Sequence, residues 1–356
     1  MKTAVLINDT STKAHLGCRI VVAQIARLAA SAGIRIAASA SVHADWREHP
    51  DLMAMMRDAD IVIVNGEGTL HDSSRQARAL AEVAPFCREA GVPSVLINSV
   101  YERNDSDIAL ACRAFDRVYV RETGSAKEAR DAGLLVEVVP DLTLSSNVMT
   151  AFRQQPRGTT IAVTDNANRA VGQRTLDEAL TREDVRFLHL DTSEPYNPFM
   201  ERPDAPEFVF MNSGRETEPL PPLPRQSTAL RAFRKSLFKP HFRRRMKMFR
   251  ELSEPLSSRQ ILSRIAISKG VVAGRFHAAC MSMLSETPFA AMSSNTSKMR
   301  GMLTDAGASR LLADDPRAAF HLVDDWRDSD KTAVAAYVQR ARRDAKAMFD
   351  DIASLL

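Results

Sequence analysis

The chain has 356 residues, 45% of them hydrophobic, and a formal net charge of +4. This length suits two domains, each with its own core, and the absence of any run of about eighteen apolar residues excludes a transmembrane helix. The four cysteines have no close paired spacing, so we predict neither a zinc cage nor disulfides and expect a cytosolic protein without a metal or a cofactor.

The positive charge is concentrated in residues 231–250. This segment contains nine Lys or Arg and no acidic residue, so the rest of the chain is net acidic. Apolar residues interleaved with the cations are typical of segments that bind an anionic membrane surface, which predicts a peripheral position at the inner face of the plasma membrane. A solvated surface loop is the alternative. No nucleic-acid-binding motif accompanies the segment, and we expect no nucleic-acid partner.

Short apolar runs alternate with helical patterns through the first 155 residues. Strands are predicted at 3–7, 34–38, 61–64, 94–97, 118–120 and 136–139, with helices at 19–32, 52–57, 74–90, 107–115 and 125–132. Such alternation predicts a parallel sheet covered on both faces, with functional loops at the carboxyl ends of its strands.

Polar residues follow the first of these strands. Asn8 and Asp9 open a loop that ends in His15-Leu16-Gly17-Cys18. We expect Asp9 to be a candidate base that activates an acceptor hydroxyl, and Asn8 and His15 to line the acceptor side of a cleft. Alternatively, Asn8 and Asp9 only shape a turn.

The third strand ends in Asn65-Gly66-Glu67-Gly68, and His71 follows shortly afterwards. Glycines allow a close approach of the backbone to a ligand, and Glu67 between them is a second candidate base. A helix N-terminal acid is the alternative role for Glu67. Asn65 and His71 are assigned to the acceptor side, while Arg121 follows the fifth strand.

A polar break at 154–158 predicts a domain boundary near residue 155. Strand patterns resume at 160–163 and 186–190, and an irregular, proline-rich stretch predicts an insertion at about 192–255. Regular patterning returns at Ser258, and 331–356 is helical by period. The prediction is an N-terminal domain over 1–155, a C-terminal domain over 156–330 and a C-terminal helix over 331–356.

Residues 270–301 read as strand, turn, helix, strand, turn and helix, with cations at both turns. Arg275 and His277 lie on the first turn, and Ser294, Asn295 and Lys298 follow the second strand at 289–292. A helix N-terminus beside fixed cations favours binding of a phosphate or carboxylate. His277 can also act as a general acid or base near neutral pH. A surface arginine and a hydrogen-bonded core histidine are the structural alternative.

Several familiar motifs are absent. The chain has no complete Gly-x-Gly-x-x-Gly, Walker A, Gly-x-Ser-x-Gly or His-Glu-x-x-His sequence. Nicotinamide-dependent, P-loop, serine-hydrolase and metalloprotease functions therefore have little support.

The motifs that are present resemble those of the polysaccharide pyruvyl transferase family. They are Gly274-Arg275-Phe276-His277-Ala278, Thr287-Pro288, Lys298-Met299-Arg300-Gly301, Asn65-Gly66-Glu67-Gly68 and Val120-Arg121-Glu122-x-x-Ser125. The resemblance covers most of the chain. It implies an α/β fold of the glycosyltransferase-B type, in which two Rossmann-like domains with parallel sheets face each other across a cleft.

The resemblance also implies a reaction of surface-polysaccharide biosynthesis. Enzymes of this family move the enolpyruvyl group of phosphoenolpyruvate onto a hydroxyl pair of a sugar, without a metal. By this resemblance Arg275, His277 and Lys298 contact the donor's phosphate and carboxylate, and Arg121 contacts them from the opposite domain. We assign Ser294 and Asn295 to the donor side. The predicted acceptor is a saccharide, lipid-linked ones included.

The first loop departs from the family, whose members commonly carry Asn-x-Gly-Asp there. This chain has Asn8-Asp9-Thr10-Ser11 followed by His15-Leu16-Gly17-Cys18. A glycosyltransferase that uses a nucleotide-activated sugar is therefore an alternative function. A non-enzymatic membrane-associated assembly factor that works through residues 231–250 is another.

Overall fold

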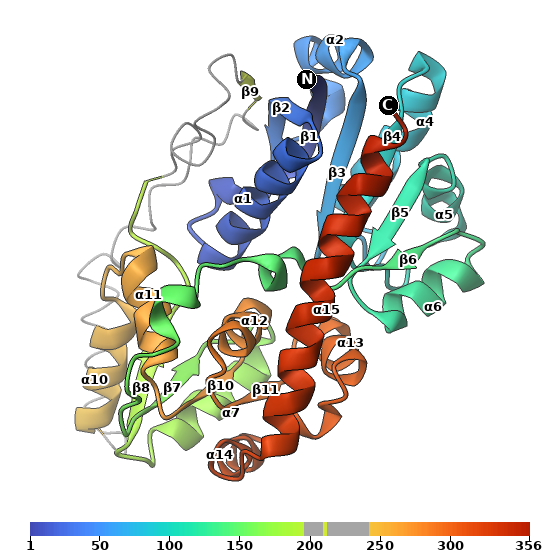
Figure 1. The fold of residues 1–356 in the computed structure, drawn as a ribbon. Helices are drawn as coiled ribbons and strands as arrows, with labels where there is room; N and C mark the ends of the chain where they lie inside the picture. The colour runs from blue at the N-terminus through green and yellow to red at the C-terminus, as the bar shows by residue number, and fades with distance from the viewer. Residues whose placement is uncertain (196–208, 212–241) are drawn as a thin grey trace.

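The computed structural model describes residues 1–195, 209–211 and 242–356. They form two parallel β-sheets flanked by helices (Figure 1). The strands are β1 (Lys2–Asp9), β2 (Ile34–Ser41), β3 (Ile61–Glu67), β4 (Ser94–Ser99), β5 (Arg117–Val120), β6 (Glu137–Val138), β7 (Ile161–Thr164), β8 (Val185–Leu188), β9 (Val209–Met211), β10 (Gly270–Ala273), β11 (Phe289–Met292) and β12 (Leu312–Ala313).

The N-terminal sheet has the order β6-β5-β4-β3-β1-β2-β9, and the C-terminal sheet has the order β12-β11-β10-β7-β8. Every pairing within them is parallel. The central strands are fully buried because helices cover both faces, which explains their continuous β-branched runs. The predicted α/β class with two parallel sheets is confirmed. The predicted boundary near residue 155 falls between β6 and β7.

The helices lie on both faces of the sheets. None of those in the described part of the chain is long and apolar enough to cross a membrane. They are α1 (Leu16–Ser31), α2 (Pro50–Asp58), α3 (Arg75–Ala81), α4 (Val83–Ala90), α5 (Ser106–Cys112), α6 (Thr123–Asp131), α7 (Arg169–Ala179), α10 (Phe242–Leu252), α11 (Ser258–Ala266), α12 (Phe276–Ser285), α13 (Lys298–Asp305), α14 (Pro316–Asp324) and α15 (Asp328–Ala353).

Two local predictions for helices are wrong. The helix predicted over 74–90 is two helices, α3 and α4, separated at Glu82. Pro85 explains the break, since it has no N–H to donate to the carbonyl of Ala81. The helix predicted over 125–132 begins earlier, at Thr123, because the carboxylate of Glu122 caps it by accepting the Ser125 N–H at 2.8 Å.

The predicted insertion at about 192–255 contacts both sheets. Within it, β9 extends the N-terminal sheet beside β2, and α10 packs against β8 of the C-terminal sheet. Residues 231–241 of the basic segment lie outside the described residues. In α10, Arg244 pairs with Glu183 at 2.7 Å, Arg245 with Asp177 at 3.3 Å, and Lys247 donates to the Val185 carbonyl at 2.8 Å. These three cations are therefore engaged with the protein itself.

Helix α15 connects the two halves. Its first turns carry Val334 and Tyr337 into the core of the C-terminal domain, and its last turns carry Met348 and Phe349 into the core of the N-terminal sheet. Figure 1 shows it as one long rod that runs from α14 to the N-terminal sheet. The helix thus belongs to both cores.

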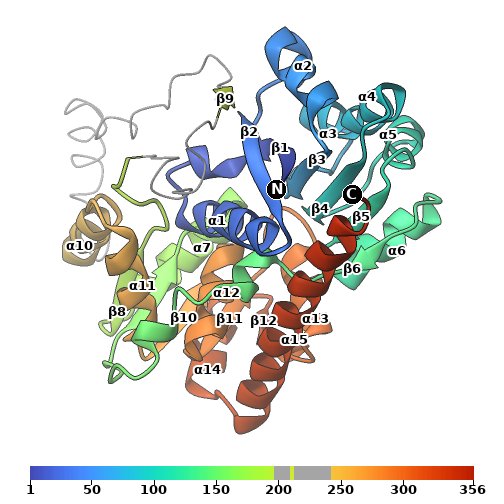
Figure 2. The ribbon, with the colours of Figure 1, turned by 45° about the horizontal axis from the view of Figure 1, so that its top comes forward.

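The N-terminal end of α1 meets α12 where the domains face each other (Figure 2). Leu16 and Ile20 of α1 share one buried cluster with Phe276 and Ala279 of α12. This contact brings the first loop of the chain against the turn that carries Arg275 and His277. The fold thereby assembles one site from two distant stretches of sequence.

Candidate active site

A cleft of about 490 Å³ lies between the carboxyl ends of the two sheets. Its wall includes eight of the twelve predicted site residues, drawn from both domains. Those eight are His15, Glu67, His71, Arg121, Arg275, His277, Ser294 and Lys298. The cations predicted at the two turns of residues 270–301 thus share one cavity with residues from the opposite domain.

Glu67 stands at the end of β3 on the N-terminal wall. Its backbone has a φ of +40°, and only 7% of the residue is exposed. Thr10 Oγ1 donates a hydrogen bond to its carboxylate, and Cys18 Sγ lies 3.5 Å from the other carboxylate oxygen. Gly66 precedes it because a Cβ there would lie 2.2 Å from Ser99 Oγ. The carboxylate is therefore held in a fixed position at the cleft.

Arg275 is oriented by a carboxylate from the neighbouring strand end. Its Nε donates to Asp165 Oδ1 at 2.9 Å, and its Nη2 contacts the second oxygen of Asp165. This hydrogen bonding raises the pKa of Arg275. The N–H groups of Gly274 and Arg275 both donate to Thr164 Oγ1, so these two backbone donors of the turn are already bound. The side chain of Arg275 remains as the donor-binding group of this turn.

Arg121 forms a buried ion pair behind the cleft. Its Nη1 donates to Asp141 at 2.7 Å, and both side chains are at most 3% exposed. The guanidinium lies 5.0 Å from the centre of the Phe276 ring. Nε and Nη2 of Arg121 are buried without a hydrogen-bond partner. Arg121 is part of the cleft wall, and two of its nitrogen donors have no acceptor.

Lys298 is the first residue of α13 and lines the cleft together with Glu67, and its Nζ would lie 3.4 Å from a Cβ on Gly68. Its ammonium group makes neither a hydrogen bond nor an ion pair with the described residues. Burial and, after it, the charge of Arg121 lower the pKa of Lys298 to about 8. Arg121 and Arg275 each have a carboxylate partner, whereas Lys298 and the exposed Lys13 are cations of the cleft wall without one among the described residues.

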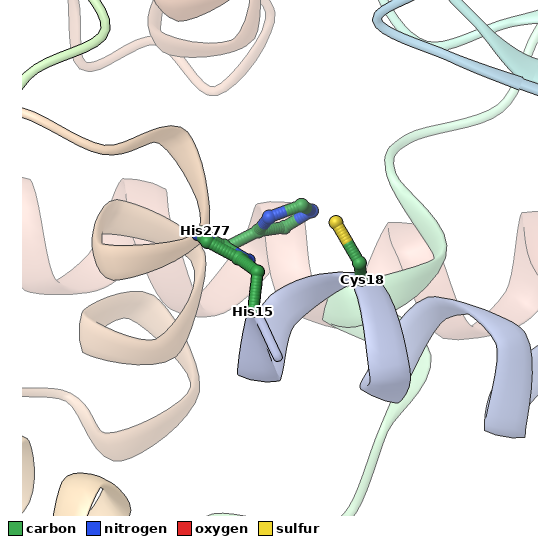
Figure 3. Close-up of side chains that lie close together, drawn as sticks. All are labelled: His15, Cys18 and His277. Atoms are coloured by element: carbon green, nitrogen blue, oxygen red, sulfur yellow. The ribbon is translucent and has the colours of Figure 1, made fainter. Parts of the chain in front are cut away.

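His15, Cys18 and His277 form a compact group at the base of the cleft (Figure 3). The two imidazole rings are 5.3 Å apart at an interplanar angle of 54°. Burial, together with His277 and Arg275, lowers the pKa of His15 to about 3, and burial lowers that of His277 to about 4 despite the nearby Asp141. Burial and Glu67 raise the pKa of the Cys18 thiol. Both rings are therefore neutral at neutral pH.

Four predicted residues lie off the wall of this cleft. The Asp9 carboxylate is fully buried and accepts hydrogen bonds from the Ser11 N–H at 3.1 Å and Ser39 Oγ at 2.8 Å. The buried side chain of Asn8 donates to the Asn65 carbonyl at 2.5 Å, and Asn65 returns a bond to the Asn8 carbonyl at 3.3 Å. Asn295 is exposed. Asp9, Asn8 and Asn65 thus hold the ends of β1 and β3 together.

Sequence reasoning assigned no site role to three residues that shape the cleft. Thr10 and Cys18 line it beside Glu67, and Asp165 orients Arg275. The signal for Cys18 was its spacing of three residues from His15 at a helix start, which places both side chains on one face. Asp165 had no signal, because its pairing depends on which strands become neighbours.

We expect Gly17→Ala to destabilise the protein although alanine is the better helix former. A Cβ on Gly17 would lie 2.1 Å from Cγ of His277, so either α1 or the imidazole must move. The free energy of unfolding should fall by about 1–3 kcal/mol in chemical denaturation. Gly158→Ala is the control, since its Cβ would meet no atom closer than 3.4 Å. Equal stability of the two variants would contradict this packing argument.

Comparison with known proteins adds a family and a fold. The family described as polysaccharide pyruvyl transferase matches residues 8–296. No curated protein matches the sequence. Among solved structures, the S. aureus MnaA–UDP complex matches with a TM-score of 0.54 at 9% identity. The matched region covers 99% of this chain and 96% of the MnaA chain. An alpha-glucosyltransferase in complex with UDP matches with a TM-score of 0.47 at 10% identity, and the matched region covers 99% of this chain and 100% of the glucosyltransferase chain. The fold is that of B-type glycosyltransferases.

Proposed function

The chain belongs to the polysaccharide pyruvyl transferase family, and on that premise we propose that it transfers the enolpyruvyl group of phosphoenolpyruvate to a saccharide. It is a transferase. The observation that carries the choice of donor is that Lys298, Arg275 and Arg121 share one cleft. Phosphoenolpyruvate has a phosphate and a carboxylate, and three fixed cations match that charge.

The three cations have different roles in binding the donor. Arg275 is already oriented by Asp165 and Arg121 by Asp141, so each presents its remaining N–H donors in a fixed direction. Lys298, which has no partner among residues 1–195 and 242–356, supplies an uncompensated positive charge. As the bond to phosphate breaks, these groups stabilise the negative charge that develops on the leaving oxygen. His277 is proposed as a further contact of the donor.

Glu67 is proposed as the base that takes the proton of the acceptor hydroxyl. Thr10 Oγ1 and Cys18 Sγ fix its carboxylate on the N-terminal wall of the cleft that Lys298 also lines. When the hydroxyl oxygen attacks the central carbon of the donor, its proton passes to Glu67, and the terminal carbon takes up a proton from water. Attack by the second hydroxyl on the central carbon then breaks the bond to phosphate and closes the ketal, and the proton of this hydroxyl passes to the leaving phosphate.

The acceptor is proposed to occupy a second hollow of about 300 Å³ on the N-terminal domain. This hollow shares His43, Thr69 and Gln76 with the main cleft, and Asn8 lines it. Its wall also carries Asp45, Glu48 and Arg75, side chains that can hydrogen-bond to sugar hydroxyls. A saccharide bound in this hollow would lie next to the main cleft, where Glu67 is, because the two spaces share three lining residues.

The experiment that tests the donor is calorimetry of the full-length protein with phosphoenolpyruvate, followed by an assay of phosphate release with candidate saccharides, lipid-linked ones included. We expect saturable binding and acceptor-dependent release of phosphate. No binding at millimolar concentration would overturn the proposal.

A nucleotide-sugar donor is the second candidate, favoured by the altered first loop and by the fold shared with the MnaA–UDP complex. Thermal-shift measurements separate the two, because a ligand that binds only the folded protein raises its melting temperature. Stabilisation by UDP or a UDP-sugar, with none by phosphoenolpyruvate, would favour glycosyl transfer.

The affinity for phosphoenolpyruvate should fall as the pH rises through about 8, the pKa of Lys298 in the free protein. Below that pH the ammonium is charged and attracts the donor, whereas above it the neutral amine does not. If one proton is required, the dissociation constant rises about tenfold per pH unit on the alkaline side. Calorimetry between about pH 7 and 9.5 measures the change, and an affinity that is constant over this range would contradict it.

A further inference from the structure

Three side chains with metal-binding atoms converge at the base of the cleft. One ring nitrogen each of His15 and His277 and Sγ of Cys18 lie within 4.8 Å of one another. Figure 3 shows Cys18 turned toward the two rings, with His15 just before α1, Cys18 on α1 and His277 on α12. We propose that this group is a binding site for a thiophilic divalent cation of the Zn²⁺ type.

The chemistry of the three ligands selects the metal. Two imidazole nitrogens and a thiolate suit Zn²⁺, whereas Mg²⁺ and Ca²⁺ prefer oxygen ligands. Three protein ligands leave a fourth position open, and all three residues line the cleft, so that position faces the space proposed for substrates. Zinc sites that take part in reactions have such an open position, whereas structural zinc sites have four protein ligands.

Unpartnered nitrogen atoms give independent support. His15 Nδ1 and His277 Nε2 are both buried and have no hydrogen-bond partner. His277 as a whole is 7% exposed. Buried polar atoms in native proteins nearly always have a partner, and a cation bound between the rings would supply one.

The surroundings also fit a bound cation. In tetrahedral coordination at ordinary Zn–N and Zn–S lengths the ligand atoms are about 3.3–3.7 Å apart, so the group must contract by about 1 Å through side-chain rotation. Two carboxylates lie next to the ligands, Glu67 at 3.5 Å from Cys18 Sγ and Asp141 at 4.0 Å from His277 Nε2. The negative charges of these two carboxylates favour a cation at this position.

His15 and Cys18 come from the stretch that sets this chain apart from its family. Where family members commonly have a glycine-rich Asn-x-Gly-Asp loop, this chain continues to His15-Leu16-Gly17-Cys18. Gly17 allows the contact with His277, since a Cβ there would overlap the imidazole. The inference revises the expectation of a metal-free site. It adds to the proposed function without depending on it, and the contact of His277 with the donor would then pass through the cation.

The test uses the full-length protein, freed of any purification tag, treated with a chelator and titrated with Co²⁺ as a spectroscopic substitute for Zn²⁺. We expect one equivalent to produce the visible bands of tetrahedral Co²⁺ and a near-ultraviolet sulfur-to-cobalt charge-transfer band, both removed by added Zn²⁺. Because the spectra are recorded without donor or acceptor, they are independent of the proposed function.

Variants then assign the ligands. Cys18→Ser should abolish the charge-transfer band and weaken Zn²⁺ affinity about 100-fold or more, since loss of an outer-shell partner alone costs 10–100-fold. His15→Gln should weaken the affinity to a similar degree while keeping the sulfur band at saturating Co²⁺. Cys87→Ser, at another buried cysteine, is the control and should leave the spectrum unchanged. Absence of the sulfur band, or its persistence in Cys18→Ser, would overturn the proposal.

Discussion

Lys298→Met is expected to lower kcat/KM for phosphoenolpyruvate by about 100-fold or more and to raise the melting temperature at the same time. The activity falls because the variant lacks a cation of the cleft that has no carboxylate partner among the described residues, and removal of one donor to a developing anion commonly costs 10²–10³-fold. The stability rises because burial of the charged ammonium, shown by its pKa of about 8, opposes folding.

The pH dependence distinguishes this explanation from a general improvement in packing. The folded-state pKa of Lys298 lies below its ordinary value of 10.5. The charge therefore destabilises the protein fully below about pH 8, and the effect vanishes as the unfolded lysine also loses its proton. Thermal melts should show a gain in the methionine variant that shrinks from about pH 8 to 10.5. Lys346→Met, at an exposed lysine, is the control. A stability gain that is independent of pH would contradict the argument.

Asp141→Asn is expected to lower the free energy of unfolding by about 3–5 kcal/mol, because it leaves the buried charge of Arg121 without a partner. Burial alone would raise the pKa of Asp141, but Arg121 and His277 outweigh it and hold that pKa below the usual range. The asparagine is nearly isosteric, and its oxygen can still accept the Thr143 N–H that Asp141 Oδ1 binds at 2.9 Å. The loss is therefore electrostatic.

Chemical denaturation with a matched surface control measures this effect. Asp131→Asn breaks the exposed pair of Asp131 with Lys127 and should change stability by about 0.5 kcal/mol or less. Adding Arg121→Met to Asp141→Asn should recover part of the loss, since no unpaired charge then remains buried. A loss below about 1 kcal/mol for Asp141→Asn would contradict the description of this pair.

The alternation of elements was readable in the sequence because parallel strands buried on both faces appear as continuous apolar runs. Residues 61–64 are the clearest case and lie in β3, at the centre of the N-terminal sheet. The pairing of β9 with β2 could not be predicted in this way, since a three-residue strand carries no periodicity of its own. Nor does periodicity show that Pro85 divides a helix.

The sequence predicted those site residues that have reactive side chains and also lie just after a strand. It could not predict those that come together only through contacts between distant elements. Arg275, His277 and Lys298 lie just after adjacent strands of one sheet, so their convergence follows from topology. The closeness of His15 and Cys18 to His277 depends on how α1 meets α12, a contact between domains. The burial of Asp9 also depends on a tertiary contact. Although Asp9 lies at a strand end, it is fully buried and accepts a hydrogen bond from Ser39 of the neighbouring strand.

Helix α15 has a mechanical consequence for substrate entry. Its 26 residues form a rod about 39 Å long, with one end fixed in each core. The domains cannot swing apart unless this rod bends or one end leaves its core. A bend in this helix would fall near residues 342–344, between the buried Ala341 of one core and Ala345 of the other. The stiffness of a single helix therefore opposes any widening of the cleft for a large acceptor.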